Sequence, residues 1–118
     1  MQNKRNNISE RLLNFAAEII KLVAQLSKSS VGRHIGGQLM RASTSAGANY
    51  EEACGAESRA DFIHKLQIVL KELRETLYWL RLLKKTALIS NSTLEALIQE
   101  GKELTNIIAK SIVTARKR

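Results

Sequence analysis

Residues 58–86 read SRADFIHKLQIVLKELRETLYWLRLLKKT, and this stretch decides the fold. Its large apolar residues recur at spacings of three and four, the period of one face of an α-helix. Ser58 followed by Asp61 resembles a capping box, with Asp in place of the usual Glu or Gln. The pattern predicts a helix over 58–86 with a core seam formed by Phe62, Leu66, Val69, Leu73 and Leu80, reinforced by Ile63, Leu70 and Leu77.

Three further segments, 9–28, 31–54 and 92–116, show the same helical period. The first is expected to start after the N-cap Ser9. Its apolar face is expected to be widened by Leu13, Ile20 and Ala24. The chain has no proline, and loops of only a few residues make consecutive helices antiparallel. The sequence therefore predicts an all-α, antiparallel up-and-down four-helix bundle, in one domain over residues 1–118.

The charge of the chain is strongly positive. It has 19 Lys and Arg against 11 Asp and Glu, a net charge of +8, which is typical of proteins that bind polyanions. No apolar run follows the basic residues near the N-terminus, and no stretch is long and apolar enough to cross a membrane. We therefore expect a cytoplasmic protein that does not interact with membranes.

A polar stripe runs along the predicted helix over 58–86, beside its core seam. At 100° per residue, His64 and Gln67 share this stripe with four cations and a tyrosine, and the row of cations with the tyrosine is about 20 Å long. Such a row can follow a phosphate backbone while the tyrosine stacks on a base. The alternative is an ordinary solvated face. The predicted nucleic-acid contacts are Lys71, Arg74, Tyr78, Arg81 and Lys85, with Arg33, Arg41 and the basic tail Arg116–Arg118 as secondary candidates.

A second stripe on the same helix contains Asp61, Glu72 and Glu75 together with three large apolar residues. The helical period places it roughly opposite the core seam. Three large apolar side chains at helical spacing on an outer face indicate a protein–protein interface, and self-association is the simplest choice of partner. The predicted oligomer interface is formed by Ile68, Trp79 and Leu82.

The sequence shows no pattern typical of a catalytic or metal-binding site. His34 and His64 do not form a two-histidine zinc pattern, and Cys54 is the only cysteine, so it cannot form an intramolecular disulfide. Gly36-Gly37 lacks the Lys-Ser/Thr of a phosphate-binding loop, and the hydroxyl residues 43–45 have no general base nearby in the sequence. We expect no enzymatic activity, no metal and no cofactor.

Residues 41–83, RASTSAGANYEEACGAESRADFIHKLQIVLKELRETLYWLRLL, resemble the bacterial four-helix-bundle family encoded in intervening sequences of 23S ribosomal RNA genes. RLLNFAAEIIKLVAQL at 11–26 and VGRHIGGQL at 31–39 extend the resemblance over nearly the whole chain. Cys54 departs from the pattern, which leads us to expect a less reactive polar residue there. The resemblance implies a compact bundle that assembles as a ring of five subunits. The family is also similar to the accessory protein of diversity-generating retroelements, a basic pentamer that binds nucleic acid and a reverse transcriptase.

These observations lead to two functional hypotheses. The first is a non-enzymatic, basic accessory protein that binds structured or single-stranded RNA as a homo-oligomer. The second is an adaptor whose positive surface binds an acidic protein partner.

Overall fold

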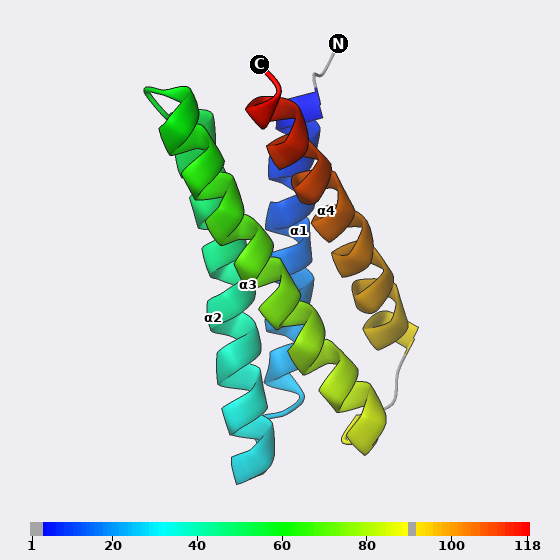
Figure 1. The fold of residues 1–118 in the computed structure, drawn as a ribbon. Helices are drawn as coiled ribbons and strands as arrows, with labels where there is room; N and C mark the ends of the chain where they lie inside the picture. Colours follow the sequence, from blue (N-terminus) through cyan, green and yellow to red (C-terminus); the bar gives the residue numbers. More distant parts are fainter. Residues whose placement is uncertain (1–3, 90–91) are drawn as a thin grey trace.

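The computed structural model describes residues 4–89 and 92–118, which form four helices running alternately up and down (Figure 1). They are α1 (Lys4–Ala24), α2 (Ser30–Cys54), α3 (Arg59–Thr86) and α4 (Ser92–Arg116). The described residues contain no strand. The predicted all-α four-helix bundle is confirmed.

Helix boundaries agree closely with the prediction except in α1. Ser58 caps α3 by accepting a hydrogen bond from the backbone N–H of Asp61, as predicted. Ser9 is not the N-cap of α1 but lies inside the helix, which begins at Lys4. The prediction missed that Ile8 is buried one turn before Leu12 and so extends the apolar face towards the N-terminus. At its other end α1 stops at Ala24, and a turn precedes α2.

The helices pack in cyclic order, each against the next along the chain, and α4 closes the bundle against α1. The contact between α2 and α3 is the most extensive, and that between α1 and α4 is the smallest. The centre is filled by side chains with almost no exposed surface, including Leu12, Ile19, Leu39, Leu66, Leu73, Leu80, Leu104 and Ile108. In the part of the chain that the structure describes, no helix is long and apolar enough to cross a membrane.

The turn between α1 and α2 leaves room only for glycine at position 32. The Oγ atom of Ser29 accepts a hydrogen bond from the N–H of Gly32 at 2.9 Å and caps α2. A Cβ atom at Gly32 would lie 2.1 Å from the backbone carbonyl oxygen of Leu26. Because this neighbour belongs to the backbone, it has little freedom to move aside. The absence of a side chain at Gly32 therefore fixes how α2 starts against the end of α1.

Candidate nucleic-acid interface

The exposed side of α3 carries the predicted basic stripe. The residues that α3 buries are Leu66, Val69, Glu72, Leu73, Thr76, Leu80 and Leu83. At 100° per residue, the direction opposite this set passes through Tyr78 and its neighbours on the helix. The structure exposes every principal candidate of the stripe, namely Lys71, Arg74, Tyr78, Arg81 and Lys85. The stripe therefore points directly away from the core, rather than lying beside it.

Most acidic groups of the protein form ion pairs with cations that lie outside the stripe. Seven of the 11 acidic residues pair with a cation, and each of these cations lies outside the stripe. Even the adjacent Lys84 pairs with Glu95 of α4 at 3.1 Å. Among the described residues, none forms an ion pair with Lys71, Arg74, Arg81 or Lys85. Four cations of α3 are thus available to an external anion.

The tyrosine of the stripe is held from one side. Tyr78 is 58% exposed, and its ring meets the edge of Trp79 with centroids 5.1 Å apart. Trp79 in turn lies 5.8 Å from the ring of His34 on α2, also in an edge arrangement. Trp79 packs against the core, so it gives the phenol ring a fixed support. The arrangement limits the directions in which Tyr78 can turn and leaves most of its surface in solvent.

The predicted placement of Ile68, Trp79 and Leu82 opposite the core is wrong. These three side chains are partly buried, and Trp79 and Leu82 pack against the core. The core seam predicted from the sequence included the apolar Ile63, Leu70 and Leu77. The buried face of α3 instead includes the polar Glu72 and Thr76. This turns the helix so that the stripe with Trp79 lies towards α2. Its exposure can therefore no longer support the oligomer interface predicted there.

A polar network joins this side of α3 to α2. The Arg41 guanidinium forms ion pairs with Glu75 and, at 3.4 Å, with Glu72, which is only 8% exposed. Ser45 donates a hydrogen bond to Glu72, and the indole N–H of Trp79 donates to Glu75 at 3.2 Å. Hydrogen bonding from Arg41, and then from Trp79, lowers the pKa of Glu75, while the hydrogen bond to Glu75 raises the pKa of Arg41. Arg41 is therefore engaged within the bundle and is not brought together with the stripe.

The other secondary candidates also lie apart from the stripe. Arg33 is exposed at the start of α2, where its Nη1 donates to the carbonyl oxygen of Ser27. The tail from Arg116 to Arg118 is exposed at the opposite end of the bundle, and Arg59 donates to the carbonyl oxygen of Arg118. The principal cations thus form one row, and the secondary ones do not extend it.

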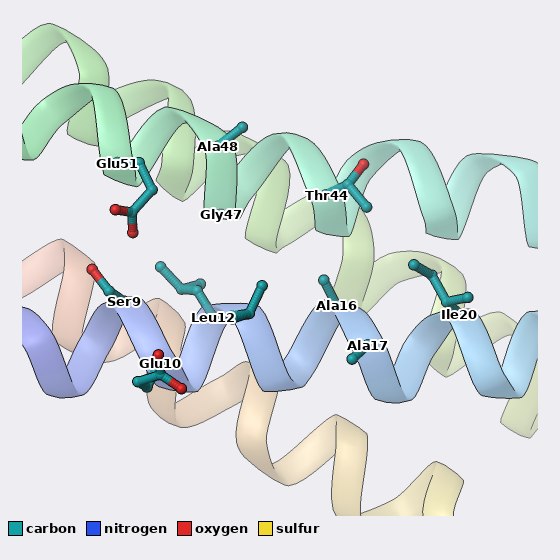
Figure 2. Close-up of a pocket in the computed structure, with 11 residues that line it drawn as sticks. Ser9, Glu10, Leu12, Ala16, Ala17, Ile20, Thr44, Gly47, Ala48 and Glu51 are labelled. Atoms are coloured by element: carbon teal, nitrogen blue, oxygen red, sulfur yellow. The ribbon is translucent and has the colours of Figure 1, made fainter.

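A groove of about 510 Å³ between α1 and α2 was not predicted (Figure 2). Leu13 and Ile20, expected in the core, are 62% and 45% exposed and line it, so that expectation is wrong. Ala24, expected on the same apolar face, is also exposed. The sequence did indicate that Leu13 and Ile20 could lie outside the core, because Leu12, Ile19 and Val23 already provide an apolar face for α1. Over the described ranges, no group of three or more His, Cys, Asp or Glu side chains is arranged to hold a metal ion.

Comparison with known proteins agrees with the architecture. The profile of the 23S rRNA-intervening sequence protein family matches residues 4–110. A crystal structure from Bacteroides thetaiotaomicron VPI-5482, described as a protein of unknown function from the S23 ribosomal protein family, is 38% identical and superposes with a TM-score of 0.85, covering 93% of this chain and 98% of its own. No curated protein matches the chain significantly. The resemblance seen in the sequence is confirmed, and the chain belongs to the 23S rRNA-intervening sequence protein family.

Proposed function

We propose that this protein is a non-enzymatic accessory protein that binds RNA, in single-stranded or structured form, through the exposed stripe of α3. The observation that carries the proposal is the row of four cations without an intramolecular ion pair among the described residues, on the side of α3 turned away from the core. Such cations have no ion-paired carboxylate to displace when a phosphate approaches, and Lys71 alone among them has a charge interaction with Glu75. Binding would gain entropy from the counterions released by the nucleic acid.

Lys71, Arg74, Arg81 and Lys85 would contact phosphates along one strand. The row extends over 14 helical steps, from Lys71 to Lys85, or about 20 Å at 1.5 Å per residue, which is long enough to contact several nucleotides in succession. Tyr78 lies in the middle of the row with most of its ring exposed, and it would stack on an unpaired base. No base-specific contact is part of this proposal, because phosphate contacts and stacking are both tolerant of sequence.

An acidic protein partner is the alternative ligand for the same cations. The position of an exposed aromatic ring between them favours RNA, because a base offers a flat face for stacking whereas a carboxylate-rich surface does not. The salt dependence of binding to RNA therefore provides the test. The logarithm of the affinity should fall linearly with the logarithm of salt concentration, with a slope of about −0.7 for each phosphate contact on single strands.

The experiment is fluorescence anisotropy with a labelled single-stranded RNA and a labelled RNA hairpin, each over a salt series. The double variant Arg74→Glu/Arg81→Glu should bind more weakly, and its salt slope should be smaller in magnitude by about 1.4, since two contacts are lost. Lys102→Glu/Lys110→Glu is the matched control, because it changes the net charge equally at two exposed positions on α4. Equal losses from both double variants, or no binding at low salt, would refute the α3 stripe and favour the adaptor.

A further inference from the structure

Three aromatic rings lie in a row across the junction of α2 and α3. His34 of α2 and Tyr78 of α3 each meet the ring of Trp79 in an edge arrangement, with interplanar angles of 83° and 78°. Trp79 is partly buried and packs against the core, whereas His34 and Tyr78 are both exposed. The centroid distances to Trp79, 5.8 Å and 5.1 Å, keep the two exposed rings within about 11 Å of each other. The α3 stripe therefore has a second exposed ring beside it, on the neighbouring helix.

Gly37 lies on α2 at the level of the exposed tyrosine. Helices α2 and α3 are antiparallel and lie side by side (Figure 1). His34 meets Trp79, and Arg41, two turns further along α2, pairs with Glu75. Gly37 lies between His34 and Arg41 in the sequence, so its level on α3 is between Trp79 and Glu75, where the tyrosine lies.

Packing does not account for a glycine at position 37. A Cβ atom on Gly32 or Gly36 would lie 2.1 Å from Leu26 or 2.9 Å from Val23, so these two glycines are required by the contact between α1 and α2. A Cβ atom on Gly37 would meet no atom within 4 Å, and the backbone of Gly37 has no positive φ. Glycine in a helix interior is less favourable than alanine, because it loses more backbone entropy on folding. Gly37 therefore weakens α2 without a gain in packing, and it leaves open space beside the aromatic row.

We propose that the α3 stripe binds single-stranded RNA with two unpaired bases stacked on the aromatic row, one on Tyr78 and one on His34, and that Gly37 leaves room for them. This inference rests on the proposed RNA binding and narrows it to unpaired stretches. The phosphates would follow the cations on the outer side of α3, and the bases would lie towards α2. Tyrosine and histidine rings both stack on unpaired bases. The separation of the two rings corresponds to about three steps of a stacked strand at about 3.4 Å each, so the two bases need not be adjacent.

The ring in the middle of the row is held in place by hydrogen bonding. The indole N–H of Trp79 donates to Glu75 at 3.2 Å, and Glu75 also accepts a hydrogen bond from Arg41 of α2. Trp79 is thus fixed between the two helices and supports an exposed ring on each side. A support that is already ordered loses little entropy when a ligand binds.

Paired bases cannot use the aromatic row. In a double-stranded RNA the bases are stacked within the helix and offer only their edges. A duplex would therefore contact the cations of the stripe alone. The row should contribute to the binding of single strands and not to the binding of duplexes.

The first experiment is fluorescence anisotropy with a labelled single-stranded RNA of mixed sequence, and with the duplex that it forms with its complement. His34→Ala should weaken binding of the single strand about fivefold or more, the effect of losing one stacked base, and leave binding of the duplex unchanged. His34→Phe is the matched control, because it keeps an aromatic ring without the two nitrogen atoms, and it should bind the single strand within about twofold of the wild-type protein. An equal loss from His34→Phe, or an equal loss on the duplex, would overturn the stacking role of His34.

The second experiment tests the space beside the rings. Gly37→Leu should raise the midpoint of thermal unfolding, because leucine favours a helix, and yet weaken binding of the single strand about fivefold or more, because its side chain fills the space for a base. Ala96→Leu, at an exposed position on α4, is the matched control and should bind as the wild-type protein does. Sedimentation equilibrium should give the same mass for Gly37→Leu as for the wild type. A changed mass would overturn the proposal, since position 37 would then belong to a contact between subunits.

The outcomes separate this inference from the proposed function. If the wild-type protein binds neither RNA at low salt, RNA binding by the α3 stripe is wrong and the two-base site is wrong with it. If Arg74→Glu/Arg81→Glu weakens binding while His34→Ala and Gly37→Leu bind the single strand as tightly as the wild type, the two-base site alone is wrong.

Discussion

Tyr78 is the residue through which the α3 stripe could distinguish a base from any other neutral surface. Its ring is exposed yet supported by the edge of Trp79. Tyr78→Ala should weaken binding to single-stranded RNA by about 1 to 3 kcal/mol, the usual contribution of one stacked base. The salt slope should stay the same, because the tyrosine carries no charge.

Tyr78→Phe is the matched control, since it keeps the ring and removes only the hydroxyl group. It should bind within about twofold of the wild-type protein. Anisotropy titrations at several salt concentrations measure both quantities. A change in slope for Tyr78→Ala, or an equal loss for Tyr78→Phe, would show that the ring does not act by stacking.

Glu75 should make the stability of the bundle depend on pH. Its pKa is lowered from the ordinary 4.5 in the folded protein, chiefly by the hydrogen bond from Arg41. A carboxylate with a lowered pKa contributes stability above its unfolded value, and this contribution is lost as the pH falls through the folded value. Glu75→Gln should therefore be less stable than the wild-type protein at pH 7, by up to about 1 kcal/mol for so accessible a pair. As the pH falls below 4.5 and through the lowered pKa of Glu75, the difference should shrink.

Urea unfolding between pH 3 and pH 7 checks this prediction, with the fluorescence of Trp79, the single tryptophan, as the probe. Glu57→Gln is the control, because Glu57 is exposed and pairs with no cation in the described part of the chain. The result would contradict the assignment if Glu75→Gln and Glu57→Gln gave the same stability difference at every pH.

The junction of α1 and α2 depends on Gly32. Gly32→Ala would force the new methyl group against the Leu26 carbonyl, so the turn must shift. We expect a loss of about 1 to 3 kcal/mol in the free energy of unfolding, as for other overpacked sites. Gly55→Ala is the control, since Gly55 has a negative φ of −97° and a Cβ atom there would approach nothing closer than 3.8 Å.

Gly55→Ala should be neutral or stabilising by up to about 1 kcal/mol, through the lower entropy of the unfolded chain. Denaturant unfolding of both variants, at one protein concentration, makes the comparison. A Gly32→Ala protein as stable as the wild type would mean that the turn adapts at no cost.

The existence and order of the four helices could be predicted because their apolar period is strong and the loops are short. The rotation of α3 could not, because its buried face includes Glu72 and Thr76. Glu72 is satisfied by Arg41 and Ser45 of another helix, and Thr76 bonds to the carbonyl oxygen of Glu72, so periodicity gives no sign of either burial. The basic stripe could be predicted because its residues recur at spacings of three and four along one helix. The groove between α1 and α2 was missed because the apolar Leu13 and Ile20 are indistinguishable from core residues when the sequence of α1 is considered alone.

The positive charge is distributed unevenly over the bundle. Helix α3 has seven Lys and Arg against three acidic residues, which gives it +4 of the total +8. The bundle is 47 Å long, so the stripe occupies less than half of its length and leaves the ends for other contacts. A long-range field centred on one helix would orient the protein as it approaches a polyanion, before any specific contact forms.

The small contact between α1 and α4 has a consequence for how the molecule opens. This seam is bridged by Arg11 of α1, which donates to Glu100 at 2.6 Å and to Glu103 at 3.0 Å on α4. Local openings start where least apolar surface is lost, so the seam between α1 and α4 should open while α2 and α3 remain paired. Native-state hydrogen exchange should show faster exchange for the amides of α1 and α4 than for those of α2 and α3, and Arg11→Met should accelerate exchange in α1 and α4 selectively. The first and last helices of the chain would then form the part of the bundle that opens first, and Arg11 is the residue whose ion pairs bridge them among the described residues.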